Sequence, residues 1–573
     1  MPTPPKKPTV NNLESTQIQV TAFTQEGLRL HQQGNFDEAQ AIYEKILHIQ
    51  PDHFDALQLL GVLFAQVKKY VQAVELLSKA LEINPNHAGA YSNRGNALKD
   101  LRQFNEALVN YDQAIAIDPG HVGAHSNRGI ALKELKRFDE ALVSYDQAIM
   151  LKPDYVDGYT NRGNVLQDLK RPDEALASYD QAIIFNPNHA GAYSNRGNVL
   201  QDLKRPDEAL ASYDQAIIFN PNHAGTFANR GITLQGLKRF DEALVSYEQA
   251  LRINPDLVTA HYNLSLFNLM RGNFKAGWQG YEWRWLNKEF DSEPLKSTKP
   301  AWDYQKTNQR LLVWAEQGIG DHIFFGSLLP ELLADVPNLL VQIDKRLIPI
   351  FSRSLPTIKF YPDDIKLPES DYDVHVPIGS LGKYLRNDEK DFLQTKNKFL
   401  ISDKTKTQTI RQDLSVTKKL ICGISWKSQN EKTGAGRSLS LERLTTIFDT
   451  KKISLVNLQY GDISEDINLL KFNSNVDLIQ YEPVDNFNDL DGFASLIDAC
   501  DFIITTDNST IHLSSALGKK SFLLLPYVSN WRWSLDGADS LWYPSTRLYR
   551  QEKINDWDSV LQKLKTDIKR FVN

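Results

Sequence analysis

Two short stretches in the second half of the chain combine glycine, carboxylate and hydroxyl groups as anion-binding turns do. The first reads Glu316-Gln317-Gly318-Ile319-Gly320-Asp321 and overlaps the end of an apolar run, 310–316. Glycines between a strand and a helix let backbone amides face an anion at the helix N-terminus. A dinucleotide fingerprint would place glycine at position 323, which is Ile323, and no Walker lysine follows, so neither a nicotinamide enzyme nor a P-loop ATPase is predicted.

The second stretch runs from Asp507 to Gly518 and contains Ser509, Thr510 and His512. It reads as another strand-to-helix turn, whose first amides would face an anion. A polar loop follows a further apolar run that ends at Trp426. Its basic and hydroxyl side chains, which could hold a diphosphate, are Lys427, Lys432, Arg437 and Ser438.

The elements that must position these groups alternate between apolar runs and helical segments, which is the pattern of α/β structure. We expect strands at 310–316, 339–343, 421–426, 454–459, 502–506 and 521–525. Helices are expected after 321 through 333 and over 493–500. The sequence therefore predicts two Rossmann-type lobes, 310–415 and 416–573, joined by a linker at 286–309 to what precedes them.

The first half of the chain is a repeat of 34 residues. Glycines and alanines keep the same step as the prolines, which stand at Pro51, Pro85, Pro119, Pro153, Pro187, Pro221 and Pro255. Each unit resembles the tetratricopeptide repeat, in which small residues let two antiparallel helices approach and proline ends the second helix. We therefore expect a superhelix over 21–285, with seven repeats and a partial capping repeat, after a flexible tail at 1–20.

One asparagine per repeat forms a ladder on the first helix of each unit, at Asn93, Asn127, Asn161, Asn195, Asn229 and Asn263. A column of carboxamides in a concave groove can pair with an extended peptide backbone without reading its side chains. The ladder resembles that of nucleocytoplasmic O-linked N-acetylglucosamine transferases. The alternative is that these asparagines form hydrogen bonds between repeats, as asparagine does at this position in many such proteins.

Composition and charge exclude several classes. A net charge of −6 lacks the basic footprint that a nucleic-acid partner needs, and two cysteines, Cys422 and Cys500, form neither a disulfide framework nor a zinc site. The sequence holds no run of about 18 apolar residues and its first residues lack a signal-peptide core. We expect a cytoplasmic protein without a membrane span.

Three turns and one tail carry a resemblance to a known family. The turns are 316–321, Gly423-Ile424-Ser425-Trp426 and 507–518, and the tail runs from Leu525 through Trp531-Arg532-Trp533 to Trp542-Tyr543-Pro544. Together they resemble the family 9, heptosyltransferase-related glycosyltransferases. The resemblance spans nearly all of 310–560 in matching order. It implies the two-lobed GT-B fold, a nucleotide-sugar donor and transfer without a metal or cofactor.

The resemblance also implies roles for individual residues. Asp321 would be the general base that deprotonates an acceptor hydroxyl, and its alternative role is capping the following helix. Asp507 would contact the donor sugar and His512 would stand in the donor site, the alternative for His512 being a packed side chain. The residues assigned to donor binding are Gly318, Gly320, Ser425, Lys427, Arg437, Asp507, Ser509, Thr510 and His512.

Several interpretations stay open at this stage. Lys427 and Arg437 are either diphosphate neutralisers or solvated cations, and Trp531, Arg532 and Trp533 either cover the nucleotide or pack the lobes. Because the first lobe is short, we expect Trp278, Trp283 and Trp285 of the last repeat to pack on it and complete the cleft. Three acidic pairs match the motif of metal-dependent transferases but are scattered: Asp371-Tyr372-Asp373, Asp489-Leu490-Asp491 and Asp556-Trp557-Asp558.

Three functions fit this pattern. The leading one is transfer of sugar to a Ser or Thr hydroxyl of a polypeptide that lies in the repeat groove. The second is transfer to a lipid-linked or polysaccharide acceptor, with the repeats recruiting a partner. The third is a protein-binding scaffold whose transferase domain no longer turns over.

Overall fold

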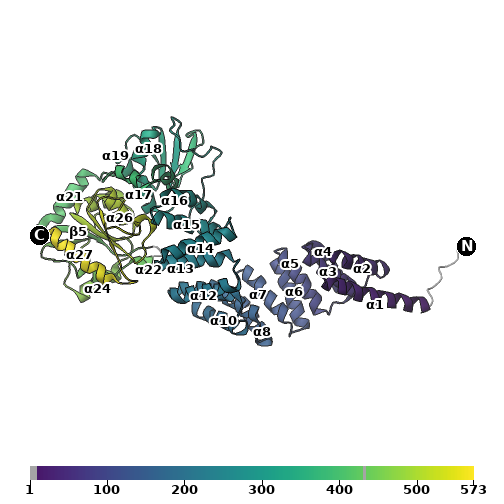
Figure 1. Cartoon of the computed structure of the whole chain (residues 1–573). Coiled ribbons are helices and arrows are strands. Elements are labelled where there is room, and N and C mark those ends of the chain that lie inside the picture. The colour runs from purple at the N-terminus through teal and green to yellow at the C-terminus, as the bar shows by residue number, and fades with distance from the viewer. Residues whose placement is uncertain (1–9, 430–433, 573) are drawn as a thin grey trace. The chain divides into compact units, whose positions relative to one another are not determined.

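The computed structural model describes residues 10–429 and 434–572 (Figure 1). Lys432 of the polar loop lies outside the described residues, as do the first nine residues of the expected tail. By its internal contacts the chain divides into two compact units, Met1–Thr233 and Leu234–Asn573. Among the described residues, no helix is both long and apolar enough to cross a membrane.

The first unit consists of antiparallel helix pairs. Its helices are α1 (Val10–Gln32), α2 (Phe36–Ile49), α3 (Phe54–Gln66), α4 (Tyr70–Ile83), α5 (Ala88–Asp100), α6 (Phe104–Ile117), α7 (Val122–Glu134), α8 (Phe138–Leu151), α9 (Val156–Asp168), α10 (Pro172–Phe185), α11 (Ala190–Asp202), α12 (Pro206–Phe219) and most of α13 (Ala224–Gly236). Residues 10–20, expected in a flexible tail, instead begin α1. The reason is apolar packing, because Val20 is fully buried in one cluster with Tyr43 and Ile46.

Glycine and tyrosine interlock in five of the helix pairs, as the repeat pattern predicts, while Gly61 meets Leu77 instead. A Cβ added to Gly95 would lie 2.6 Å from the ring of Tyr111, and one added to Gly197 would lie 2.5 Å from the ring of Tyr213. These tyrosines are fully buried. Any larger residue in place of the glycine would therefore push the two helices apart.

The turn inside each repeat carries a residue in the left-handed conformation at the same 34-residue step. Glycine occupies this position in the first and last repeats, where Gly34 and Gly272 have φ of 80° and 78°. The six repeats between them have long basic side chains with φ of 58–62°, at Lys68, Arg102, Lys136, Lys170, Lys204 and Lys238. The same turn geometry therefore recurs in repeats whose sequence has no glycine to predict a left-handed residue.

The second unit begins with the last repeats, in α14 (Phe240–Ile253), α15 (Val258–Met270), α16 (Phe274–Tyr281) and the 3₁₀-helix η1 (Glu282–Leu286). A four-stranded parallel sheet follows, with strand order β3-β2-β1-β4. Its strands are β1 (Leu311–Trp314), β2 (Leu339–Ile343), β3 (Lys359–Pro362) and β4 (Val374–Pro377). The helices that follow β1 are α17 (Ile319–Gly326) and α18 (Leu329–Asp335).

A six-stranded parallel sheet forms the last part of the chain, in the order β10-β9-β8-β5-β6-β7. The strands are β5 (Leu420–Ser425), β6 (Ile453–Asn457), β7 (Leu478–Ile479), β8 (Phe502–Thr506), β9 (Ser521–Leu525) and β10 (Thr546–Arg550). Its helices include α24 (Ser464–Asn473), α25 (Leu490–Ala499), α26 (Ser509–Ala516) and α27 (Trp557–Val572). The two parallel sheets confirm the expected α/β class, after a helical tetratricopeptide array.

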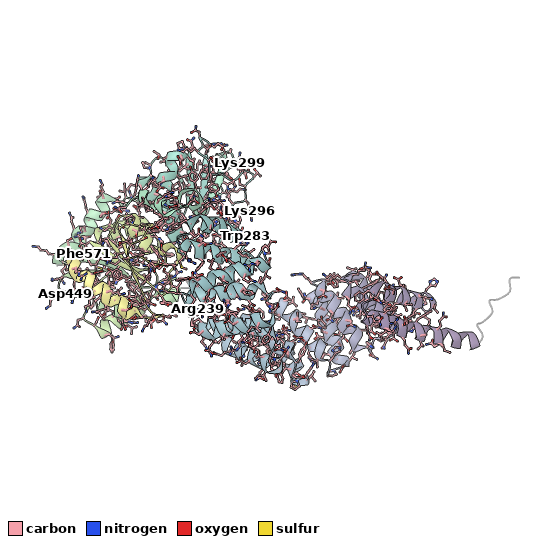
Figure 2. All side chains as sticks on the ribbon, in the orientation of Figure 1. Arg239, Trp283, Lys296, Lys299, Asp449 and Phe571 are labelled. Carbon is pink, nitrogen blue, oxygen red and sulfur yellow. The ribbon has the colours of Figure 1, made fainter. Side chains whose placement is uncertain are left out.

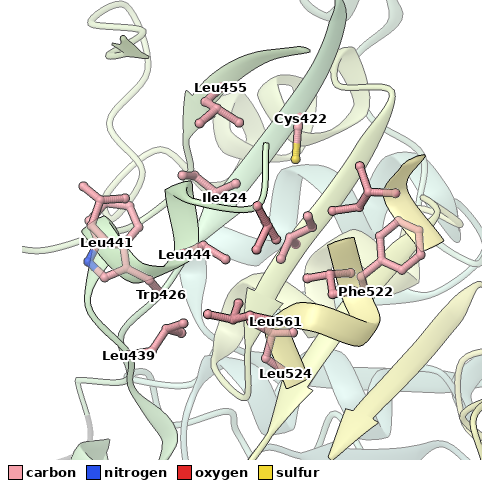
Figure 3. Close-up of a cluster of buried hydrophobic side chains, with 14 of the residues drawn as sticks. Cys422, Ile424, Trp426, Leu439, Leu441, Leu444, Leu455, Phe522, Leu524 and Leu561 are labelled. Atoms are coloured by element: carbon pink, nitrogen blue, oxygen red, sulfur yellow. The ribbon is translucent and has the colours of Figure 1, made fainter. Parts of the chain in front are cut away.

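The core of the larger sheet joins β5, the loop after it and α27. Figure 3 shows Cys422, Ile424 and Trp426 beside Phe522 and Leu561 in this cluster. Trp426 is fully buried. Because Trp426 comes directly after β5, its burial fixes the start of the polar loop that follows it.

The expected strands all form. Those at 339–343, 502–506 and 521–525 match residue for residue, and the ends of the other three shift by one or two residues. The expected helix that continues to 333 is instead two helices, because Pro330 lies in the first turn of α18 and cannot continue α17. The strands β3, β4, β7 and β10 are short or partly exposed and were not expected from the sequence.

Candidate functional site

The two predicted turns meet in one cavity of about 310 Å³ within the second unit. The lining comes from both α/β sheets and includes two aspartates, two arginines and a histidine among the described residues. The lining residues are Ile319, Gly320, Asp321, Ser428, Arg437, Tyr460, Asn486, Phe487, Leu490, Asp507, Asn508, Ser509, His512 and Arg532.

The strand order explains why these residues converge. In the larger sheet, chain order reverses direction between β5 and β8, and in the smaller sheet between β1 and β4. Open parallel sheets bind ligands beyond the carboxyl ends of strands at such switch points. The turn after β1 and the turns after β5 and β8 therefore supply the walls of the cavity.

Gln317 and Gly320 shape the first turn. Gln317, and not a neighbouring glycine, has a left-handed backbone with φ of 64°, and its N–H donates to Ser292 Oγ at 2.7 Å. Gly320 has another use, because a Cβ there would lie 3.2 Å from His512 Cδ2. The glycine thus lets the two sheets' turns approach closely, and Gln317 stores the conformational strain.

Asp321 is ion-paired with Arg532, a residue 211 positions away in the sequence. Their side chains are 20% and 13% exposed. Asp321 Oδ2 also lies 3.4 Å from the Gly318 N–H at the start of α17. Asp321 therefore faces the cavity, and from inside the first turn of α17 it also lies beside the N–H of Gly318, the residue before that helix.

Asp507 has two partners at the opposite wall. Trp533 Nε1 donates to Asp507 Oδ1 at 2.9 Å, and Arg437 Nη1 lies 3.2 Å from Asp507 Oδ2. The side chain of Asp507 is 6% exposed. The indole and the guanidinium together fix the orientation of this buried carboxylate.

The start of α26 is tied to the end of β5 by Asn508. Asn508 Oδ1 accepts from the Thr510 N–H at 3.0 Å, and Asn508 Nδ2 donates to Ser425 Oγ at 2.7 Å and to the Lys427 carbonyl at 3.0 Å. Ser509 lines the cavity. Asparagine here therefore caps the helix whose first amides face the cavity.

Three of the predicted donor-site side chains are not part of the cavity lining. Ser425 and Thr510 are fully buried, and the Ser425 hydroxyl donates to Gln459 Oε1 at 2.9 Å. Lys427 forms an ion pair with Asp466 of α24. Local partners already satisfy the polar groups of these three side chains, so they support the lining without being part of it. Gly318 supports it as the residue before α17.

His512 is buried between aromatic rings at the base of the cavity. Its ring stacks on Trp533 with centroids 5.6 Å apart, and Nδ1 lies 3.1 Å from the Tyr543 hydroxyl. Burial, assisted by the Arg532 cation, lowers the pKa of His512 to about 4. A histidine at this position is neutral near pH 7 and serves as a polar, uncharged surface.

Sequence reasoning missed most of the aromatic and amide lining. Tyr460 and Phe487 have ring centroids 6.3 Å apart at one end of the cavity, and Asn486 beside them has a buried Oδ1 without a hydrogen-bond partner among the described residues. No motif surrounds these positions. For Arg532 a signal existed, since it lies between Trp531 and Trp533, which are the packing residues of that triplet.

Glu316, at the end of the first turn's strand, forms a fully buried ion pair with Arg284 of η1. Arg284 Nη2 lies 3.0 Å from Glu316 Oε2 and donates to Ser380 Oγ at 2.8 Å. Burial raises the pKa of Glu316 to about 7, against the opposing effect of Arg284. A Cβ added to Gly379 would lie 1.6 Å from Glu316 Oε1, so only glycine fits beside the pair.

The last repeat packs on both sheets of the second unit. Trp278 is fully buried, donates from Nε1 to the Arg386 carbonyl at 2.7 Å, and meets Trp531 edge-on with centroids 5.5 Å apart. Trp285 packs on Trp314 at 5.3 Å. The expectation of packing is confirmed for these two tryptophans.

Trp283 instead stacks on His261 inside the array, at a centroid distance of 3.8 Å. Figure 2 labels it in η1, with Lys296 and Lys299 in the linker after it. Among the described residues, the repeat helices contribute none of the cavity lining. They brace it, because α15 packs on the 3₁₀-helix η6 (Trp531–Trp533) that carries Arg532.

Within the first unit, the asparagine ladder makes hydrogen bonds between repeats. Nδ2 of Asn127, Asn195 and Asn229 donates to Oδ1 of an asparagine in the preceding repeat, at distances of 2.8–2.9 Å. The acceptors are Asn96, Asn164 and Asn198. Asn93 and Asn161 follow repeats with Val62 and Ile130 at the acceptor position, which cannot accept a hydrogen bond. The inter-repeat interpretation therefore holds for three of the six asparagines, Asn127, Asn195 and Asn229. The last asparagine, Asn263, belongs to α15 of the second unit.

The acidic pairs have structural partners. Asp373 pairs with Arg310 at 2.7 Å, Asp491 pairs with Arg353 at 2.7 Å, and Asp489 caps α25 through the Gly492 N–H. Asp556 accepts from the Ser559 N–H at 3.1 Å. In the described part of the chain, no three His, Cys, Asp or Glu side chains gather as a metal site would require.

Comparison with known proteins places tetratricopeptide repeats across the N-terminal region. Profiles described as "Tetratricopeptide repeat" match residues 30–93, 88–121, 156–189 and 188–256, and one described as "TPR repeat" matches 131–170. Protein FlbA of Caulobacter vibrioides is 28% identical over 339 residues, which cover 55% of this chain and 56% of FlbA. The chain thus matches little more than half the length of that relative.

Parts of the chain are similar to solved structures, among them YrrB, described as a TPR protein with an unusual peptide-binding site. YrrB is 28% identical, with a TM-score of 0.29, covering 34% of this chain and all of YrrB. PilF of Pseudomonas aeruginosa is 23% identical, with a TM-score of 0.34, covering 37% of this chain and 96% of PilF.

Proposed function

We propose that this chain is a glycosyltransferase that moves a sugar from a nucleotide-sugar donor to an acceptor hydroxyl. The observation that carries the proposal is the convergence of two predicted turns. Gly320 and Asp321 of one sheet and Asp507, Ser509 and His512 of the other line a single cavity at the carboxyl ends of parallel strands.

The lining supplies each group that such a transfer needs. Asp321 would accept the acceptor's hydroxyl proton while the hydroxyl oxygen bonds to the anomeric carbon. The bond from that carbon to the diphosphate oxygen breaks, and its electron pair leaves with the nucleoside diphosphate. Arg437, Arg532 and the first amides of α26 would stabilise the charge on that leaving group without a metal.

A polypeptide with Ser or Thr hydroxyls is the proposed acceptor, held along the tetratricopeptide array. What supports this is the first unit's row of carboxamides, of which Asn93 and Asn161 have no asparagine partner in the preceding repeat. A carboxamide can donate to and accept from a peptide backbone. The test below also covers lipid-linked and polysaccharide acceptors.

The experiment incubates the purified chain with radiolabelled nucleotide sugars and a lysate of its host. We expect label in polypeptide, and we expect Asp321→Asn to lower that incorporation by about 100-fold or more while the protein stays folded. Label confined to lipid or polysaccharide would reject the polypeptide acceptor. The absence of transfer and of donor hydrolysis across a broad donor panel, with peptide binding retained, would establish a scaffold instead.

A further inference from the structure

The charged side chains that line the cavity balance one another in the described structure. Asp321 and Asp507 face Arg437 and Arg532, and each carboxylate is paired with one guanidinium. A nucleoside diphosphate carries at least two negative charges into this space. An arginine that exchanges its aspartate for phosphate would neutralise part of this charge, together with the first amides of α26.

Arg532 is built for such an exchange. Its guanidinium lies over the rings of Trp531 and Phe324, at 4.9 and 5.0 Å from their centroids, which fixes its plane without using its N–H groups. Nη1 donates to Asn530 Oδ1 at 3.1 Å. Nε is buried and has no hydrogen-bond partner among the described residues. An unmet donor of this kind is costly, and a phosphate oxygen would satisfy it.

The pair also constrains Asp321. The Arg532 guanidinium occupies Asp321 Oδ1, an oxygen that would otherwise be free to take the acceptor's proton. Asp507 differs, since Trp533 Nε1 still holds it when Arg437 is elsewhere. Beyond Arg532, Asp321 has only the Gly318 amide at 3.4 Å among the hydrogen bonds of the described structure. Release of Arg532 would therefore leave the Asp321 carboxylate with only this long contact, whereas release of Arg437 leaves Asp507 held by Trp533.

We propose that Arg532 is a latch on the catalytic base, resting on the proposed function given above. In the structure Arg532 holds Asp321. When the donor arrives, Arg532 moves its Nη2 and Nε donors to the diphosphate, and Asp321 becomes free to take the acceptor's proton. Base activation thus follows donor binding, and the same guanidinium that restrained the base then neutralises the leaving group.

The test is equilibrium binding of ADP, GDP, UDP and CDP by calorimetry, which needs no turnover. Wild type is compared with Asp321→Asn, Arg532→Ala and the double variant. Because the latch makes Asp321 compete with phosphate for Arg532, we expect Asp321→Asn to bind the preferred nucleotide about tenfold more tightly, equivalent to about 1.4 kcal/mol. Arg532→Ala should bind it about tenfold more weakly, by the same conversion.

The double variant separates the latch from simple charge repulsion. If Asp321 acted only through space, removing it would tighten binding equally in the Arg532→Ala background, and that result would overturn the latch. We expect its effect there to shrink to less than about twofold, as coupled neighbours require. Asp321→Ser serves as a second variant should Asp321→Asn fold poorly. If wild type binds none of the four nucleotides, the proposed function itself fails; if wild type binds one and Asp321→Asn does not tighten it, only the latch fails.

Discussion

Arg284 and Glu316 form a fully buried ion pair that joins η1, after the last repeat helix, to the turn that follows β1. Arg284 Nη2 lies 3.0 Å from Glu316 Oε2, and both side chains are excluded from solvent. Five residues beyond Glu316, the chain reaches Asp321. The repeat array therefore contributes a charged contact to the support of the turn that carries the proposed base.

Breaking this pair should destabilise the second unit severely. Arg284→Met would leave Glu316 buried and unpaired, which costs about 3–5 kcal/mol. All ten tryptophans lie between 278 and 557, so tryptophan fluorescence during urea unfolding reports on this unit alone. The matched control is Arg310→Met, which removes a half-exposed pair with Asp373 and should cost less than about 1 kcal/mol. Equal effects of the two substitutions would contradict this account.

Arg437 and Lys427 should differ sharply in their effect on nucleotide binding. Arg437 lines the cavity, whereas Lys427 is occupied by Asp466. Arg437→Ala should weaken nucleoside diphosphate binding by about tenfold, or about 1.4 kcal/mol, since it removes a charge-assisted contact. Lys427→Ala should change it by less than about twofold. A larger loss in Lys427→Ala, measured by calorimetry, would return that lysine to the donor site.

His512 should make the protein sensitive to acid. Its pKa is lowered to about 4 by burial, while an unfolded histidine titrates near 6.5. Between these values the unfolded chain binds the extra proton, so this contribution to stability is present above about pH 6.5 and is lost as pH falls towards 4. Replacing His512 with Gln removes this pH-dependent contribution to stability. Between about pH 6.5 and about pH 4, the free energy of unfolding of wild type should fall by up to about 3 kcal/mol more than that of His512→Gln. Unfolding experiments at each pH measure both values. Equal losses in the two proteins would refute this prediction.

Asn161 and Asn195 offer a matched pair within the ladder. They begin two identical stretches, 161–191 and 195–225, but only Asn195 follows a repeat with an asparagine at the acceptor position. Asn195→Ala should destabilise the first unit by about 1 kcal/mol, and Asn161→Ala by less. Circular dichroism detects the tryptophan-silent unfolding of this unit. If Asn161→Ala costs as much as Asn195→Ala, the inter-repeat bond is not what distinguishes them.

Chelation gives a direct test of metal dependence. The acidic pairs are engaged in local contacts, such as Asp373 with Arg310 and Asp491 with Arg353. If Arg437 and Arg532 neutralise the leaving group, transfer rates should be unchanged by excess EDTA. A loss of transfer that added Mg²⁺ or Mn²⁺ restores would show that the arginines are insufficient.

Much of the fold can be predicted from the periodicity of the sequence, because the small and large residues that recur are the ones that pack against each other. Gly95 and Tyr111 interlock in space as their 34-residue recurrence predicts, and the strands at 502–506 and 521–525 match their apolar runs. The half-exposed strand β3 and the two-residue strand β7 escape prediction, since neither has an apolar run long enough to stand out from its surroundings.

The site was predictable where a motif marks it and not elsewhere. Asp321 and His512 belong to recognisable turns, and the structure brings them to one cavity. Lys427 shows the limit, because its pairing with Asp466 depends on where α24 packs, which the local sequence does not encode. Phe487 lies in a loop without a motif and enters the lining through tertiary packing alone.

The burial of Trp278 and Arg284 sets where the polypeptide can be cut. A recombinant fragment starting at 310 would keep every described residue of the cavity lining yet expose the surfaces that these two side chains cover, including the ring of Trp531 and the carboxylate of Glu316. Such a truncated fragment would aggregate, whereas a fragment that begins near residue 224 retains both Trp278 and Arg284. For expression and crystallisation, the α/β half of the chain therefore starts inside the repeats.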